Sequence, residues 1–362
     1  MSEQQQKLEQ MRGLLDAYNV DALWLRLASS FAWATCGKSS YINTAASEGL
    51  ASLLVTRDHR YVITTNIEEP RLAQEEGLLA AGWEFVAPEW HDSRDVVAEL
   101  GKGLRLASDG SAPGVLDVSG PLARMRANLT PEEGERFRSL GNICADAMDN
   151  AIRAVLPGMS EYEIASLLAG ETERRGAQAI VNLIATDERI FRYRHPLPTN
   201  KRMDSYAMMV LGGRKWGLVC SITRLVHFGP LSDELRRKQD ACAVVDATFV
   251  STTRPNVKLG DIIAQVQDTY ALGGYAGEWR LHHQGGSTGY EPREYLGVPG
   301  SQDEVRAGQA YAWNPSITGT KIEDSLLVGA DDNIVVTAIT GWPMIPVEIG
   351  GKVYERPAIL ER

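Results

Sequence analysis

The stretch that decides the fold runs from Met208 to Val226 and reads MMVLGGRKWGLVCSITRLV. It holds two largely apolar runs, separated by a short segment that contains glycine and charged residues. This pattern predicts two strands, over 206–211 and 217–226, joined by a turn.

Helical patterns lie on both sides of this pair of strands. Before it, two long helices are predicted at about 132–155 and 160–175, split by Pro157-Gly158. Thr130, Pro131 and Glu133 form a capping box at the start of the first helix, with proline at the first helical position. After it, helices are predicted at about 231–250 and 260–272. Pairs of helices that alternate with strands favour an antiparallel sheet with helices on one face, an α/β (α+β) fold.

Four further segments carry the polar residues of interest. They are His195-Pro196-Leu197-Pro198-Thr199, the run LHHQGGSTGYEPREY at Leu281–Tyr295, Trp313-Asn314-Pro315, and Lys321-Ile322-Glu323-Asp324. Each motif alone is weakly specific. Their order and spacing together are a strong fold signal and a weak substrate signal, because one fold hosts many functions.

Together these segments resemble the pita-bread family of methionine aminopeptidase, aminopeptidase P, prolidase and creatinase, over roughly residues 130–350. The peptidases of that family hold two metal ions with two Asp, one His and two Glu. The resemblance places these five ligands at Val210, Ser221, Gly286, Asn314 and Glu323, so that only Glu323 keeps a ligand of the family. Hard divalent cations need anionic oxygen donors, and Val210 offers none. The resemblance therefore implies a degenerate metal site, with no metal and no other cofactor.

The resemblance extends more loosely to the N-terminal part of the chain. Short strands and helices there predict a creatinase/prolidase-like α/β domain over residues 1–125, followed by the pita-bread domain over 130–362. Relatives with this arrangement are homodimers, so a homodimer is expected.

Composition excludes several classes of partner. The chain has 362 residues and a net charge of −10, which argues against nucleic acid because phosphate binding requires a basic surface. No apolar run is long enough to cross a membrane, and the polar start of the chain lacks the apolar core of a signal peptide. Four scattered cysteines without CxxC spacing indicate reduced thiols. We expect a cytoplasmic protein.

The candidate catalytic residues are His195, His282 and Glu323. In creatinase, which works without metal, a histidine at the place of His195 is the proposed acid and base; the alternative is a surface loop residue. His282 matches a histidine of aminopeptidase P that contacts substrate. His283 is expected to point to the opposite face of a strand and to be structural. Glu323 either orients the substrate or anchors a cationic group, or it is a relic of the metal site.

The candidate substrate-binding residues follow from the same comparison. Arg293 would hold a substrate carboxylate, with an ion pair to Glu294 as the alternative. Asn314 and Ser221 would donate or accept hydrogen bonds where the metals would have been. The remaining candidates are Tyr290 and Trp313, as walls of the cleft or as core residues, and Glu294.

The preferred hypothesis is a metal-independent enzyme that hydrolyses a C–N bond of a small, carboxylate-bearing metabolite, with His195 moving the proton. One alternative is a lyase, cyclase or isomerase that uses the same residues, and another is a binding protein. A further alternative is a new single-metal site built from His195, His282, Glu294 and Glu323, since three nitrogen or oxygen ligands suffice for catalytic zinc.

Overall fold

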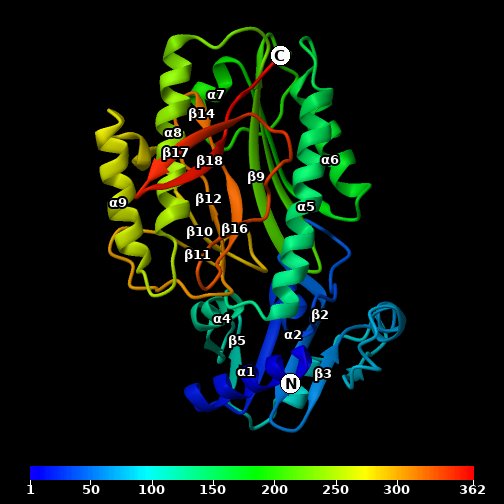
Figure 1. Cartoon of the computed structure of the whole chain (residues 1–362). Helices are drawn as coiled ribbons and strands as arrows, with labels where there is room; N and C mark the ends of the chain where they lie inside the picture. Colours follow the sequence, from blue (N-terminus) through cyan, green and yellow to red (C-terminus); the bar gives the residue numbers. More distant parts are fainter. The chain divides into compact units, whose positions relative to one another are not determined.

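The computed structural model describes residues 1–362 and divides the chain into two compact units (Figure 1). The first unit comprises Met1–Arg126 together with Trp216–Leu218, and the second comprises Ala127–Lys215 and Val219–Arg362. The boundary lies between the expected domains at 1–125 and 130–362. The short turn at 216–218, which groups with the first unit, was not anticipated from the sequence.

The first unit is built on a mixed sheet of six strands. Its order is β4 (Glu84–Val86), β3 (Arg60–Ile63), β2 (Glu48–Thr56), β1 (Ala22–Leu27), β5 (Leu106–Ser108) and β6 (Leu116–Asp117). The helical segments are α1 (Glu3–Tyr18), α2 (Ala28–Ala34), the π-helical turn η1 (Arg71–Glu75), α3 (Val96–Leu100) and α4 (Ser119–Arg126). The short strands expected in this part of the chain are present. Helix α2, which follows β1 directly, was not predicted from the sequence.

The second unit contains two pairs of long helices. They are α5 (Pro131–Ala154) with α6 (Glu161–Glu173), and α8 (Asp233–Thr252) with α9 (Leu259–Leu272). The predicted capping box is confirmed, because the Glu133 backbone N–H donates to Thr130 Oγ1 and the Thr130 N–H donates to the Glu133 carboxylate. None of the helices in the protein is long and apolar enough to cross a membrane.

The strands of the second unit form two main sheets. The four-stranded sheet has the order β19 (Leu360–Glu361), β9 (Leu218–His227), β8 (Tyr206–Lys215) and β7 (Gln178–Thr186). The five-stranded sheet has the order β11 (Tyr295–Leu296), β10 (Gly285–Thr288), β12 (Ala310–Trp313), β15 (Asp324–Leu327) and β16 (Ile334–Val335). The unit also contains two separate two-stranded hairpins. They are β13 (Ser316–Ile317) with β14 (Thr320–Lys321), and β17 (Met344–Ile349) with β18 (Lys352–Pro357).

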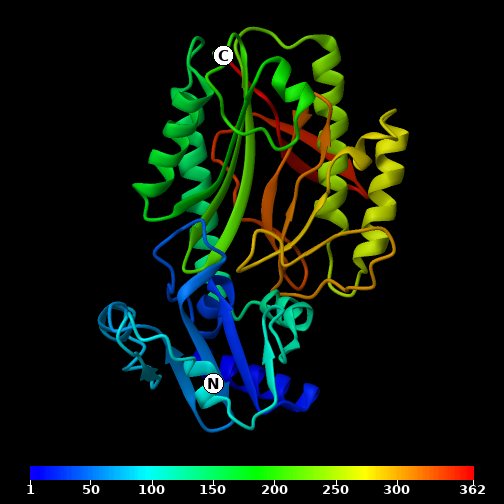
Figure 2. The same ribbon diagram turned by 180° about the vertical axis from the view of Figure 1, so that it is seen from behind.

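The two helix pairs flank these strands on opposite sides of the unit, as two views half a turn apart show (Figures 1 and 2). Helices α5 and α6 pack on β7 and β8, whereas α8 packs on the two hairpins and on α9. The apolar core under α8 and α9 includes Phe249, Tyr311 and Trp313. The predicted combination of helix pairs and antiparallel strands is therefore present.

The two main sheets meet where β9 passes the start of β15. The Thr223 N–H donates to the Glu323 carbonyl oxygen at 3.0 Å, and the Val219 N–H donates to the Gly289 carbonyl oxygen at 2.7 Å. These bonds bring Ser221 and Thr223 of β9 next to Glu323. Residues about 100 positions apart in the sequence thus share one polar region.

Candidate active site

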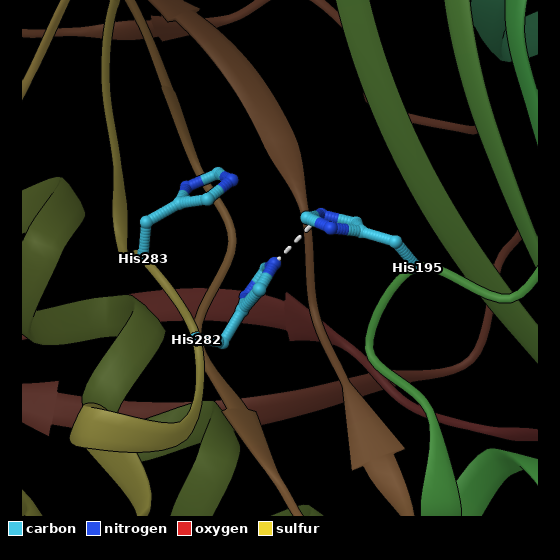
Figure 3. Close-up of side chains that lie close together, drawn as sticks. All are labelled: His195, His282 and His283. Carbon is cyan, nitrogen blue, oxygen red and sulfur yellow. Dashed lines mark hydrogen bonds between the residues drawn. The ribbon is translucent and has the colours of Figure 1, made fainter.

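Three histidines converge in the second unit (Figure 3). His195 lies in the proline-rich segment after the short helix α7 (Glu188–Arg192), and His282 directly follows the 3₁₀ turn η2 (Glu278–Leu281). The Nε2 atoms of His195 and His282 are 2.9 Å apart, so one ring donates and the other accepts. His282 is 8% exposed, whereas the rings of His195 and His283 are partly buried and partly open to solvent.

The third member of the group, His283, corrects the expectation that neighbouring histidines point to opposite faces. Its ring centroid lies 4.4 Å from that of His282 and 5.5 Å from that of His195. The expectation was wrong because both residues precede β10, which begins at Gly285, so the alternation of a strand does not apply to them. The His-His doublet was visible in the sequence, but its side-chain directions were not.

The environment of the three imidazoles favours their neutral forms. Burial lowers the pKa of His282 to about 2, and the nearby charge of Lys321 adds to the effect. Burial, followed by the charge of Arg293, lowers the pKa of His283 to about 4. Burial and Lys321 also lower the pKa of His195, although Glu323 opposes them. All three rings are therefore uncharged at neutral pH.

Glu323 is buried between two cationic groups. Its Oε1 accepts from Arg293 Nη2 at 2.9 Å, and its Oε2 accepts from Lys321 Nζ at 3.0 Å and from Thr223 Oγ1 at 2.7 Å. Although burial alone would raise it, the charges of Lys321 and Arg293 hold the pKa of Glu323 at about 2. The carboxylate stays ionised, and the three charges sum to +1. Lys321 was part of a predicted motif, but no role was predicted for it.

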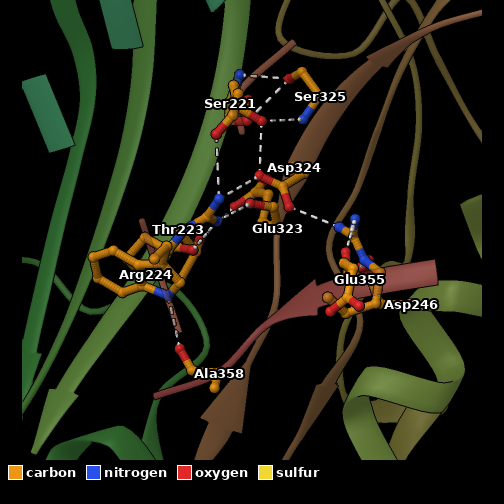
Figure 4. Close-up of polar contacts among 12 residues, drawn as sticks. Ser221, Thr223, Arg224, Asp246, Glu323, Asp324, Ser325, Glu355 and Ala358 are labelled. Carbon is orange, nitrogen blue, oxygen red and sulfur yellow. Dashed lines mark hydrogen bonds and ion pairs between the residues drawn. The ribbon is translucent and has the colours of Figure 1, made fainter. Parts of the chain in front are cut away.

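The next residue, Asp324, faces a different set of partners (Figure 4). It accepts from Arg224 Nη2 at 2.7 Å and from Arg356 Nη2 at 2.7 Å, and Thr337 Oγ1 donates to it at 2.7 Å. Arg356 also donates to Asp246, and all of these charged side chains are buried. Arg224 is thus part of a buried network that joins β9 to β15.

A second ion pair ties together the segments that carry the imidazoles. Arg194, next to His195, donates from Nη2 to Glu278 Oε2 at 2.7 Å and to Thr318 Oγ1 at 3.0 Å. Glu278 begins the 3₁₀ turn that leads to His282, and Thr318 lies in the turn between β13 and β14, where Lys321 ends the second strand. Arg194 therefore links three loops at one point.

Several buried polar atoms around these groups have no partner in the protein. They include the Asn314 Oδ1, the His282 Nδ1 and the Arg293 Nε atoms. Asn314 is only 2% exposed, and it follows β12 directly. Buried polar atoms are partnered in the great majority of cases, so a cluster of orphans indicates a place where a ligand or ordered water completes the hydrogen bonding.

Of the other predicted residues, Ser221 lies at this place and three lie elsewhere. Ser221 Oγ accepts from Arg293 Nη1 at 3.4 Å. The Tyr290 hydroxyl donates to Glu133 of α5 at 2.6 Å, and the Glu294 carboxylate accepts from the Tyr290 N–H at 2.9 Å. Trp313 stacks on Phe249 in the core, with ring centroids 4.4 Å apart. The structure thus favours the core alternative for Trp313 and gives Glu294 a loop-forming contact in place of the Arg293 pair.

The residues at the family's five metal positions do not fit a pair of metal ions. Val210 lies in an apolar cluster with Met208 and Leu225 and offers no donor atom. At Gly286 a Cβ would lie 2.2 Å from the Tyr295 carbonyl oxygen, so no side chain has room there. Asn314 is neutral, and the Glu323 carboxylate is taken up by two cations. Hard cations prefer several anionic oxygens, which this set does not supply.

The single-metal alternative built on His195, His282, Glu294 and Glu323 does not assemble either. Glu294 accepts from the backbone of its own loop, and Glu323 pairs with Lys321 and Arg293. The side chains whose ligand atoms do lie within 4.8 Å of one another are His195, His282 and His283.

A fold of two helix pairs around joined antiparallel sheets, preceded by a smaller α/β unit, defines the pita-bread class. The model of metallopeptidase family M24 matches residues 135–338, more than half of the chain. The chain belongs to metallopeptidase family M24, which confirms the resemblance and the predicted fold.

Curated relatives match part of the chain at low identity. An uncharacterized peptidase, YqhT, of Bacillus subtilis is 24% identical over 235 residues, which cover 62% of this chain and 65% of the relative. A Xaa-Pro dipeptidase of Lactobacillus helveticus is 22% identical over 225 residues, covering 59% of this chain and 61% of that protein. The match thus spans less than two thirds of the length of these relatives.

Solved structures match the whole chain in fold. A Xaa-Pro dipeptidase from Bacillus anthracis superimposes with a TM-score of 0.80 at 19% identity, covering 99% of this chain and 100% of that chain. A prolidase from Pyrococcus horikoshii gives 0.78 at 18% identity, covering 92% and 98%. The N-terminal domain of the FACT complex subunit SPT16 from chickpea gives 0.71 at 12% identity, covering 93% and 96%. At these identities the likeness concerns the fold.

Proposed function

We propose that the protein is an enzyme that hydrolyses a C–N bond of a small, carboxylate-bearing substrate by histidine-mediated proton transfer, without the two metal ions of its family. One observation carries the proposal. His195 faces His282 with 2.9 Å between their Nε2 atoms, beside buried Lys321 and Glu323 and half-buried Arg293. A hydrogen-bonded pair of uncharged imidazoles is suited to accept and return a proton.

The two imidazoles have different roles in this proposal. His195 is open to solvent, so its ring can approach a reacting group, whereas His282 is buried and holds the His195 ring through their shared hydrogen bond. A water molecule adds to the substrate carbon and gives up a proton to His195. His195 then returns that proton to the leaving nitrogen, the C–N bond breaks, and the products are an amine and the hydroxylated carbon fragment.

The charge of the site supports an anionic substrate. Lys321 and Arg293 together outweigh Glu323 by one positive charge, and burial strengthens the resulting potential. Asn314 Oδ1 and Arg293 Nε are buried and unpartnered, so a substrate that carries both an N–H and a carboxylate would satisfy them. The amide oxygen accepts from the N–H, and the guanidinium donates to the carboxylate.

A non-hydrolytic lyase, cyclase or isomerase is the second candidate. It is favoured by the lack of anionic oxygen ligands at Val210, Gly286 and Asn314, because no metal then lowers the pKa of a water molecule. A reaction that only moves a proton within the substrate needs the imidazole pair and no activated water. The substrate preference for a carboxylate is the same in both cases.

Turnover in ¹⁸O-labelled water separates these possibilities. Chelator-treated protein would be incubated with N-acyl amino acids, guanidino acids and Xaa-Pro dipeptides, and the products examined by mass spectrometry. Hydrolysis predicts release of an amine and one ¹⁸O atom in the other product, both abolished by His195→Asn. Conversion without ¹⁸O would assign the site to the second candidate. Binding by calorimetry without any conversion would contradict both and indicate a binding protein.

A further inference from the structure

The three imidazoles form a group that the proposed proton transfer does not fully use. His283 has no role in that reaction, yet its ring lies against both of the others (Figure 3). The group contains a ligand atom from each of His195, His282 and His283 within 4.8 Å of the other two. One of the three rings is buried and two are open to solvent, so an ion can reach the group without a rearrangement of the core.

We propose that His195, His282 and His283 bind one late first-row transition-metal ion, with Zn²⁺ as the representative, and that this ion inhibits the enzyme. Imidazole nitrogen is a preferred ligand of zinc, copper and nickel, and three protein ligands with one open position are a common arrangement for zinc. An ion between the rings takes the Nε2 lone pair of His195 and replaces the hydrogen bond to His282 that holds the His195 ring in place for proton transfer. Metal binding and proton transfer are then mutually exclusive.

This group is separate from the five metal positions of the family. None of its three ligands stands at Val210, Ser221, Gly286, Asn314 or Glu323, and it contains no carboxylate. The two carboxylates of this region are occupied, since Glu323 pairs with Lys321 and Arg293, and Glu278 pairs with Arg194. A nitrogen-only ligand set selects against Mg²⁺, Ca²⁺ and Mn²⁺, which prefer oxygen.

The charges that face the group indicate a reversible ligand. The cations Lys321 and Arg293 and the anion Glu323 leave one positive charge nearby, which opposes a divalent ion. The His282 Nδ1 has no carboxylate or carbonyl acceptor, a contact that tightly held metal sites usually provide. We therefore expect binding that a chelator reverses, in contrast to the resident metal of a zinc enzyme.

The binding half of the inference is tested without any substrate. The full-length protein, freed of metal by a chelator and dialysed, would be titrated with ZnCl₂ by calorimetry and with CoCl₂ by visible absorption, which reports nitrogen ligands directly. We expect one ion per chain, and a loss of affinity of about a hundredfold in His283→Gln and in His195→Gln. The matched control is His59→Gln, an exposed imidazole that pairs with Glu84 in the first unit and should leave the affinity unchanged.

Two results would overturn the site: no saturable binding, or binding that persists in both ligand variants. Circular dichroism of each variant would confirm that it is folded. The inhibitory half rests on the proposed function, and it predicts that one equivalent of Zn²⁺ stops turnover by the wild type and that a chelator restores it. Saturable zinc binding with undiminished turnover would refute inhibition and leave the site in place. Turnover that survives His195→Asn would refute the proposed function and leave the binding result untouched.

Discussion

Two neighbouring carboxylates, Glu323 and Asp324, are directed to opposite surroundings. Asp324 accepts from Arg224, Arg356 and Thr337 in a buried network, and Arg356 continues the network to Asp246 (Figure 4). Glu323 is equally buried and also paired. Its surroundings contain the unpartnered atoms of Asn314, Arg293 and His282 and two imidazoles open to solvent, whereas the Asp324 network leaves Arg224 Nε unpartnered.

The surroundings of Asp324 and Glu323 differ in what their charged groups do. The Asp324 network stabilises the fold, whereas the group around Glu323 is suited to bind a ligand. A buried ion network whose carboxylates are fully partnered is stable only as a whole, and it stabilises one arrangement of the strands. A region that leaves buried polar atoms unpartnered sacrifices stability, and such exceptions concentrate at functional sites. Two residues adjacent in the sequence can therefore serve opposite purposes.

The largest effect is expected on turnover in His195→Asn. Removal of a general acid and base lowers turnover by about 100- to 10,000-fold. Because His195 is exposed and lies in a loop, the free energy of unfolding should change by no more than about 0.5 kcal/mol. Steady-state kinetics on the substrate identified in the ¹⁸O experiment, together with urea unfolding, measure both quantities. A turnover within threefold of the wild type would mean that the imidazole pair is not catalytic.

In the Asp324 network, a substitution is expected to lower the free energy of unfolding. Arg356→Met leaves Asp246 and Asp324 short of a partner, and breaking a buried ion pair costs about 3–5 kcal/mol of unfolding free energy. Urea unfolding provides the measurement, with Arg57→Met as control, since Arg57 pairs with Asp16 at the exposed surface and its loss should change stability far less. Equal effects of the two variants would show that the network does not stabilise the fold.

A smaller, pH-dependent effect is expected in Lys321→Met. The pKa of Glu323 is held at about 2, below its ordinary value of 4.5, so this carboxylate contributes stability above pH 4.5 that is lost as the pH falls towards 2. Without Lys321 the pKa rises and this contribution shrinks. The variant should be less stable by about 2 kcal/mol at pH 7, and the difference should close only as the pH approaches 2. The urea midpoints of the wild type and the variant would be measured across this pH range. A difference that stays the same at every pH would contradict the coupling between Lys321 and Glu323.

The smallest effect is expected from Asn314→Leu. Asn314 Oδ1 is buried without a partner, so an apolar side chain of similar size should leave stability unchanged or raise it by about 1 kcal/mol. Asn333→Leu is the matched control, because Asn333 Nδ2 donates to the carbonyl oxygens of Val250 and Thr253, and its loss should destabilise by about 1–2 kcal/mol. Thermal unfolding of both variants decides the point. A destabilised Asn314→Leu would show that the amide is satisfied within the fold.

The fold could be predicted well from local signals. The capping box at Thr130 and the periodicity of the apolar residues located the long helices to within a few residues. Short elements such as α2 and α7 were missed because a helix of five to seven residues has little periodicity of its own.

The site was predicted only in part because its geometry depends on distant contacts. The structure brings His195 and His282, both candidates from the sequence, into contact. The direction of the His283 side chain is set by an irregular segment before β10. The ion pair between Glu323 and Lys321 depends on how β14 and β15 lie next to β9. Trp313 was a substrate-binding candidate because it stands next to Asn314 in the sequence, but its ring packs on Phe249 in the core. Four expectations stay predictions: the homodimer, the cytoplasmic location, the lack of a nucleic-acid partner and the lack of a cofactor.

The most direct test of catalysis without the family's metal ions is turnover by protein whose metal content has been determined by mass spectrometry after chelation. We predict undiminished turnover with far less than one metal ion per chain, and no stimulation by Mn²⁺ or Co²⁺. Turnover that disappears on chelation and returns in proportion to added Mn²⁺ or Co²⁺ would contradict the proposal.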